Sequence, residues 1–253
     1  MTLHLILERR IAHLVIDRAE KRNALTQAMW EALPALIDQA MINPDVRVMI
    51  VRAAQPGAFS AGADIAEFAE GARDPAWRQK NQAAIRRAME SLSLAPKPVI
   101  AQVEGDCIGG GCGLALACDF RIAAPAARFG ITPAKLGLVY SLHDTKLLVD
   151  LVGAAAAKRI LFTARLIDAA EALRIGLIDE VSAASGDAAQ ALAHDIAAVS
   201  PHSVRAGKAM IGRILQGQVQ DDAATLAQFA DAFDGPDFAE GVAAFLGKRK
   251  AEF

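Results

Sequence analysis

Short apolar runs alternate with longer amphipathic stretches over the first half of the chain, and this alternation limits the folds that the chain can adopt. The strand-like runs are Leu3–Leu7, Ile11–Ile16, Val46–Val51, Val99–Val103 and Phe120–Ala123. The first two flank three charged residues and are typical of a hairpin. Strands that alternate with helices form crossover units, so the sequence predicts an α/β domain with a largely parallel sheet.

The amphipathic stretches carry the start and stop signals of helices. Thr26 is a predicted N-cap for a helix through about Ala40, in which Pro34 should produce a kink or a local break. A second helix is expected over Pro75–Leu94, where a proline-rich stop follows it. A shorter helix is expected over Cys112–Ala117, directly after a run of glycines.

The last third of the chain has a different pattern. From Ala155 onward it is rich in alanine and helical in spacing, with breaks at Gly176, Ser185-Gly186, Ser200-Pro201 and Gly235-Pro236. We expect an all-helical layer that packs on the sheet or on a neighbouring subunit. The predicted division is an α/β core over residues 1–195 and a helical C-terminal region over 196–253.

Composition and charge exclude several classes of function. The formal net charge of -2 gives no basic footprint for a nucleic acid or a membrane surface. The longest apolar run, Gly109–Ala117, has only about half the length that crosses a bilayer. Cys107, Cys112 and Cys118 fall in one apolar stretch, and no secretory signal precedes them. We therefore expect reduced core thiols in a cytoplasmic protein.

Two glycine-bearing segments each follow a predicted strand and open a predicted helix. They are Ala58–Ile65 and Gly105–Gly113. A helix start leaves N–H groups without partners, and glycine lets a ligand oxygen approach the backbone. One amide from each loop could form an oxyanion hole. Tight turns and close packing explain the same glycines equally well from the residues alone. Nucleotide-binding loops need a Lys-Ser/Thr or a glycine spacing that is not present.

Several segments, in the right order along the chain, resemble the enoyl-CoA hydratase/isomerase (crotonase) superfamily. They are Asp17–Leu25, Ala58–Ile65, Val103–Asp119, Leu166–Ala172 with Gly176–Asp179 behind it, and Glu240–Lys250. The resemblance implies a crotonase-like repeated ββα core, the ClpP/crotonase fold, with a helical C-terminal trimerisation region. It also implies an acyl-CoA thioester substrate, no cofactor apart from the CoA of the substrate, and a homotrimer or hexamer.

The resemblance assigns roles to individual residues. The two oxyanion amides fall on Ala63 and Gly110, and the backbone carbonyls of Ala61 and Ala63 would lie near the CoA adenine. Lys21 and Arg22 belong to the segment that usually approaches the CoA phosphates. Asp64 is also expected to cap the helix that follows its loop. The residues expected to bind CoA are Lys21, Arg22, Ala61, Asp64 and Ile65.

The chain departs from the family at the acid/base positions. Hydratases of this family typically use one glutamate to activate water and another to deliver a proton to the α-carbon. These positions correspond to Gly113 and Pro133, and a third acidic position of some relatives corresponds to Ser141. None of these side chains can replace a carboxylate. A general base contributes about 10²–10⁴-fold to a rate, so hydration should be slow.

Other residues are candidates for the missing acid or base. His143 titrates near neutrality when unperturbed, and Asp144 could orient it or act alone. Asp144 could equally be a helix cap, and Asp106 is a third candidate that could equally serve a turn. A Ser141-His143-Asp144 triad is not expected, because sequence neighbours point in different directions. The spacing of the five histidines predicts no metal site.

The resemblance therefore predicts an enzyme of fatty acid metabolism of the hydratase/isomerase type, a lyase in reaction class. Its substrate would be a 2-enoyl or 3-enoyl thioester, with the enolate held by the Ala63 and Gly110 amides. The alternatives are isomerisation, dehalogenation or thioester hydrolysis on the same scaffold, and a non-catalytic acyl-CoA-binding trimer.

Overall fold

The computed structural model describes residues 2–253, and its central feature is a six-stranded sheet. The strand order is β1-β2-β3-β4-β6-β9, and a smaller sheet has the order β5-β7-β8. The strands of the large sheet are β1 Leu3–Glu8, β2 Ile11–Ile16, β3 Val48–Ala53, β4 Val99–Val103, β6 Phe120–Ala123 and β9 Glu180–Val181. Those of the small sheet are β5 Asp106–Ile108, β7 Arg128–Gly130 and β8 Ile167–Asp168. Only the β1–β2 and β7–β8 pairs are antiparallel.

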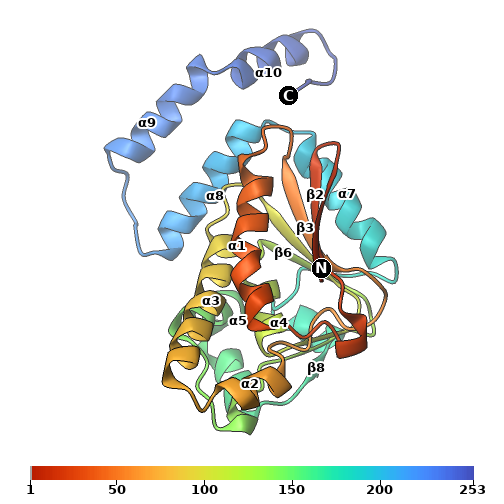
Figure 1. The fold of residues 1–253 in the computed structure, drawn as a ribbon. Helices are drawn as coiled ribbons and strands as arrows, with labels where there is room; N and C mark the ends of the chain where they lie inside the picture. The colour runs from red at the N-terminus through yellow and green to blue at the C-terminus, as the bar shows by residue number, and fades with distance from the viewer. Residues whose placement is uncertain (1) are drawn as a thin grey trace.

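The sheet is buried on both faces where it is parallel. Every residue of β2 is buried, including His13, as expected for a mostly apolar strand in the interior of a sheet. On one face lie α1 (Gln27–Ile42) and α3 (Pro75–Ser93), which pack against each other. On the other face lies α7 (Ser185–Ala197), and its Ala189 and Ala193 contact a separate cluster of buried isoleucines. Figure 1 shows this three-layer arrangement, with the β-strands between α1 and α7.

Helix α1 begins as predicted but does not break. The Thr26 hydroxyl accepts the Met29 N–H at 3.3 Å, which confirms the N-cap. Pro34 lies inside one helix that continues to Ile42, so the predicted break is wrong. Leu33 and Ile37 beside it are almost completely buried, and this packing offsets the hydrogen bond that proline cannot donate.

Each glycine segment leads into a short helix, and a long helix lies further along the chain. They are α2 (Ile65–Gly71), α4 (Gly110–Leu116) and α5 (Leu142–Thr163). Helix α5 consists of two helices joined at Gly153, where φ is 71°. A glycine accepts this left-handed conformation without a steric penalty.

The C-terminal third is helical, with one correction. Its helices are α6 (Ala169–Arg174), α7, α8 (Pro201–Leu215), α9 (Ala223–Asp231) and α10 (Pro236–Leu246). The prediction of an all-helical region is wrong at β8 and β9, which are too short to leave a periodic pattern. Helices α9 and α10 extend beyond the rest of the molecule (Figure 1). In the described part of the chain, no helix combines the length and apolar character that crossing a membrane needs.

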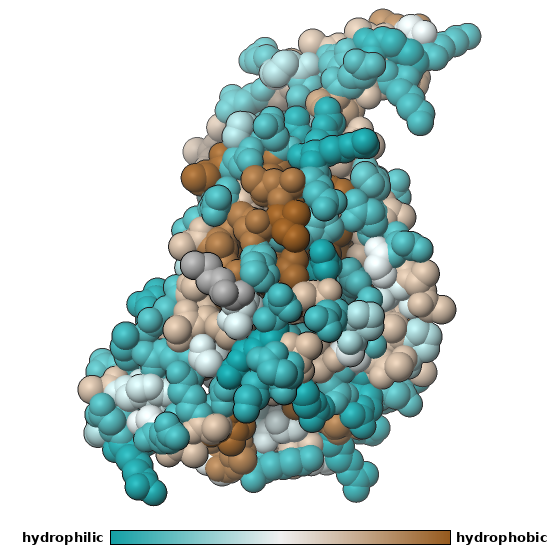
Figure 2. Space-filling model, turned by 45° about the vertical axis from the view of Figure 1, so that its right-hand side comes forward, coloured by the Kyte–Doolittle hydropathy of each residue, from teal (hydrophilic) through white to brown (hydrophobic). Residues whose placement is uncertain are grey.

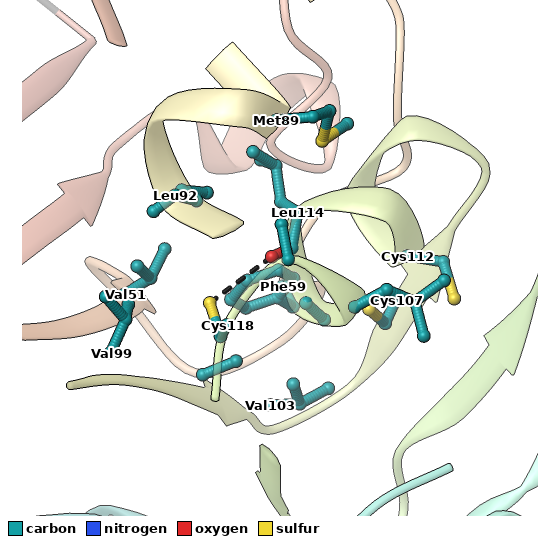
Figure 3. Close-up of a cluster of buried hydrophobic side chains, with 14 of the residues drawn as sticks. Val51, Phe59, Met89, Leu92, Val99, Val103, Cys107, Cys112, Leu114 and Cys118 are labelled. Atoms are coloured by element: carbon teal, nitrogen blue, oxygen red, sulfur yellow. Dashed lines mark hydrogen bonds between the residues drawn. The ribbon is translucent and has the colours of Figure 1, made fainter. Parts of the chain in front are cut away.

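The three cysteines are buried free thiols of the core. Cys118 Sγ donates to the Leu114 carbonyl at 3.2 Å, as drawn in Figure 3. Burial raises the pKa of the Cys118 thiol to about 12. The Cys118 thiol therefore stays protonated and acts as a small apolar side chain.

Candidate active site

Three segments distant in the sequence meet at one end of the large sheet. The Ile108 N–H donates to the Ser60 carbonyl at 2.9 Å, which joins the second glycine segment to the first. The Leu25 N–H donates to the Gly62 carbonyl at 2.7 Å, which joins the first glycine segment to residues 17–25. The two glycine segments thus lie side by side, joined by an isolated bridge between Ser60 and Cys107 of β5.

Asn23 holds this junction together. Its side chain donates to the Ala58 carbonyl at 2.7 Å and accepts the Arg18 N–H at 2.9 Å. Its own carbonyl accepts the Ser60 hydroxyl at 2.8 Å. Asn23 is buried with φ of 56°, a left-handed conformation that asparagine tolerates better than most residues. The local chemistry of one asparagine therefore fixes the position of the first loop.

The amide nitrogens of Ala63 and Gly110 are brought close together at this crossing. A Cβ atom placed on Gly110 would lie 3.7 Å from the Ala63 nitrogen. One placed on Gly62 would lie 2.8 Å from the Gly110 nitrogen, so only glycine at position 62 leaves that amide accessible. Neither the Ala63 nor the Gly110 N–H donates a hydrogen bond to any of residues 2–253. Both residues are partly exposed.

The predicted base candidates form a pair. His143 Nδ1 lies 3.0 Å from Asp144 Oδ1, and His143 Nε2 lies 3.3 Å from the Ser93 hydroxyl. Asp144 is buried in the first turn of α5, and its N–H donates to the cap residue Ser141 at 3.0 Å. The structure therefore brings the His143 and Asp144 side chains together, although sequence neighbours were expected to point in different directions, and the helix cap is Ser141 and not Asp144.

The position that corresponds to the first glutamate is filled by two other side chains. A Cβ atom on Gly113 would lie 2.8 Å from Met89 Cε and 3.0 Å from the Tyr140 hydroxyl. Pro133 begins the 3₁₀ turn Pro133–Leu136. Figure 3 shows Met89 reaching from α3 toward α4. Neither Met89 nor Tyr140 was predicted, because the packing of α3 and α5 on α4 leaves no local signal.

Asp106 is held by two arginines. Its carboxylate accepts Arg128 Nε at 2.7 Å and Arg128 Nη2 at 2.9 Å, and it also pairs with Arg22. The hydrogen bonds from Arg128 are the main reason that the pKa of Asp106 is lowered. Asp106 is thus an ionised partner of arginine, which does not suit it as a proton donor at neutral pH.

The predicted CoA-binding residues surround this ion pair and the first loop. Arg22, Asp106 and Arg128 line a cavity of about 360 Å³, and Lys21 is exposed in the 3₁₀ turn Ala19–Lys21. Ala61 lies in the first loop, and its N–H donates to the Arg22 carbonyl at 2.9 Å.

Asp64 and Ile65 lie just beyond that loop. The Asp64 carboxylate accepts the Ala66 N–H at 3.1 Å and pairs with Arg18 at 2.7 Å. The hydrogen bond from Arg18 is the first cause of its lowered pKa. Ile65 is exposed at the start of α2. Asp64 is therefore placed as the predicted helix cap. Over residues 2–253, no cluster of His, Cys, Asp and Glu side chains could hold a metal ion.

The fold and the crossing loops together define an α/β protein in which two neighbouring backbone amides face outward from glycine-rich segments. Comparisons with known proteins identify the class. The enoyl-CoA hydratase/isomerase family model matches residues 7–253. The chain belongs to this family.

Relatives of known name support the same assignment. The chain is 34% identical to short-chain-enoyl-CoA hydratase of Clostridium acetobutylicum, covering 97% of this chain and 94% of that protein. It is also 34% identical to mouse mitochondrial methylglutaconyl-CoA hydratase, over 97% and 80% of the two chains. The crystal structure of an enoyl-CoA hydratase/isomerase family protein from Hyphomonas neptunium superposes with a TM-score of 0.97 at 41% identity, covering 100% of this chain and 97% of that one.

Proposed function

We propose that this protein is an acyl-CoA enzyme of the enoyl-CoA hydratase type, in which the Ala63 and Gly110 amides hold the thioester carbonyl oxygen. The observation that carries the proposal is the pair of neighbouring N–H groups without acceptors, on two partly exposed residues. When a nucleophile adds to C3 of an enoyl thioester, negative charge develops on the carbonyl oxygen. Two preorganised N–H donors stabilise that charge and so lower the barrier.

The CoA part of the substrate would lie along the first loop and the basic residues beside it. Arg22 and Arg128 offer guanidinium groups next to the cavity, and Lys21 adds an exposed ammonium. Arginine binds phosphate oxygens in a bidentate manner. Ala61 and Ala63 would supply backbone carbonyls near the adenine, and we propose no cofactor apart from the substrate's own CoA.

The acid/base step is the part in which this chain departs from its relatives. No carboxylate occupies positions 113, 133 or 141. We propose the His143–Asp144 pair as the substitute, because the Asp144 carboxylate lies 3.0 Å from His143 Nδ1 and so can orient the imidazole, as carboxylates do in other histidine-based sites. Hydration would then be slow compared with that of relatives.

The same observation favours a second candidate function. Without a carboxylate to activate water, the polarised thioester could undergo another reaction of the superfamily, such as double-bond isomerisation. It could also be bound without turnover.

The experiment is a panel of CoA thioesters incubated with the purified protein and analysed by mass spectrometry. A product of crotonyl-CoA that is heavier by one water supports hydration. A product of unchanged mass but different retention time supports isomerisation. Binding without conversion supports a binding protein. A complete lack of binding would contradict the proposal.

We also propose that the protein assembles as a homotrimer or as a hexamer made of two trimers. The helices α8–α10 expose large apolar side chains that a monomer would leave in water. They are Ile211, Ile214, Leu215, Leu226, Phe229, Phe233, Phe238, Phe245 and Leu246. Figure 2 shows a mostly hydrophilic face of the molecule, on which a separate hydrophobic patch lies below the projecting C-terminal end.

A further inference from the structure

We propose that Tyr140 is a specificity-determining residue, whose hydroxyl donates a hydrogen bond to an acceptor oxygen on C3 of the acyl chain. The inference deepens the proposed function and rests on it. Three observations about the same side chain carry it: where the hydroxyl lies, what it contacts, and which protonation state it keeps.

The hydroxyl lies beside the proposed position of the thioester. The hydroxyl lies 3.0 Å from the position that a Cβ atom on Gly113 would occupy, which places it against the first turn of α4. Residues three apart on a helix share one face, so Gly113 lies on the same face as Gly110. The axial rise between them is about 4.5 Å. A carbonyl oxygen held by the Gly110 amide would therefore place the next carbons of the acyl chain near the Tyr140 hydroxyl.

The hydroxyl has no hydrogen-bond partner. Tyr140 Oη is buried, and none of residues 2–253 accepts from it or donates to it. The rest of the ring packs against the main hydrophobic core. A buried polar atom without a partner is unfavourable, and native proteins satisfy nearly all such atoms. An acceptor oxygen of the ligand would satisfy this one.

The hydroxyl is a donor and not a base. Burial raises the pKa of Tyr140 well above its ordinary value, and the neighbouring Cys112 thiol, Asp144 carboxylate and Cys107 thiol raise it further. At neutral pH the phenol is therefore protonated. A glutamate in this region would accept a proton from water, whereas the phenol can only offer a proton to an oxygen. A phenol in place of the glutamate therefore alters which acyl groups the protein binds, and its hydrogen bond transfers no group.

The chemical class of ligand follows from this donor and its surroundings. An uncharged acceptor oxygen on C3, as in a 3-oxoacyl or 3-hydroxyacyl thioester, fits a neutral phenol. A negatively charged carboxylate fits less well, because the Asp144 carboxylate is near enough to affect the phenol. A saturated acyl chain offers no acceptor and leaves the hydroxyl without a partner.

The test compares 3-oxobutyryl-CoA with butyryl-CoA, which differ only in the C3 oxygen, by isothermal titration of the full-length protein. The wild type should bind the 3-oxo thioester at least about fivefold more tightly, the ratio that one net hydrogen bond sustains. Tyr140→Phe should reduce this ratio to about one and leave the butyryl-CoA affinity unchanged. Ser93→Ala, the matched control, removes a hydroxyl that contacts His143 and should keep the preference.

Folding of the variant is checked separately. Phenylalanine fills the same space and removes a buried hydroxyl without a partner, so the melting temperature of Tyr140→Phe should not fall. A fall would show that the hydroxyl has a protein partner and would contradict the inference. Tyr140 is the single tyrosine of the chain, so the ultraviolet absorbance of tyrosinate reports on it alone. Ionisation at or below pH 10 would also overturn the inference.

The failures of the two proposals are distinguishable. If the wild type binds neither thioester, the proposed function is wrong. If it binds both with equal affinity, or if Tyr140→Phe keeps the preference, only the role of Tyr140 is wrong.

Discussion

Gly62 leaves the amide nitrogen of Gly110 open to solvent, since a Cβ atom at position 62 would lie 2.8 Å from it. The two glycines belong to different loops, 48 positions apart by their numbering (110 − 62). One loop therefore controls access to the amide of the other. The absence of a single side chain is what keeps the proposed oxyanion site accessible.

Gly62→Ala should abolish turnover by covering the Gly110 amide. Loss of one oxyanion donor lowers kcat by about 10²–10³-fold. The change also places alanine at φ of 90°, which costs about 1–2 kcal/mol of stability. Gly217→Ala is the matched control, because Gly217 has φ of 95° with open space around its Cβ direction. The control shares the left-handed strain but not the clash with backbone atoms, so it should lose less stability in thermal unfolding and keep its activity; equal activity of both variants would exclude the proposed role of Gly110.

Asp144→Asn should lower kcat about 10²-fold, with little change in thioester affinity. The substitution keeps the shape of the side chain but removes the carboxylate that contacts His143 Nδ1 at 3.0 Å. Single-turnover rates and titration of the thioester measure the two effects separately. Unchanged turnover in both Asp144→Asn and His143→Ala would show that the pair is structural.

Asp106→Asn should destabilise the protein at neutral pH and have little effect in strong acid. The folded-state pKa of Asp106 is lowered from its ordinary value of 3.8, chiefly by hydrogen bonds from Arg128. The ionised form is therefore stabilised by folding at pH above that value. This contribution disappears as the pH falls through the lowered pKa. The melting temperatures of the wild type and of Asp106→Asn should converge as the pH falls below the ordinary carboxyl pKa of 3.8. A difference that stays constant with pH would contradict the ion-pair assignment.

Phe245→Asp should convert the proposed trimer to monomers without unfolding the subunit. The Phe245 side chain is 83% exposed on α10, so a charge is tolerated in the monomer but costly in an apolar interface. Light scattering at micromolar concentration measures the mass, and circular dichroism checks the fold. A monomeric wild type would contradict the proposed assembly.

The sequence predicts the fold where the local pattern is strong. Ile11–Ile16, Val99–Val103 and Phe120–Ala123 are mostly apolar runs with one polar residue each, and each forms a strand with the predicted bounds. Strands β8 and β9 have only two residues each, so no periodicity can reveal them. Pro34 was misjudged because its tertiary packing outweighs a local preference.

The candidate site was only partly predictable for the same reason. The glycine segments could be identified because their loops carry unusual composition. The closeness of Tyr140 to position 113 results from the packing of α3, α4 and the start of α5, which no short segment encodes. The pairing of Asp106 with Arg128 likewise joins two strands of the small sheet and is visible only in three dimensions.

The burial of Cys107, Cys112 and Cys118 makes the folded protein inert to thiol reagents. All three flank or belong to α4, the helix that follows the second glycine loop. An alkylating reagent can react with them only when this part of the core opens. The rate of alkylation therefore measures how often the segment behind Gly110 separates from its neighbours, in the native protein and without any introduced label.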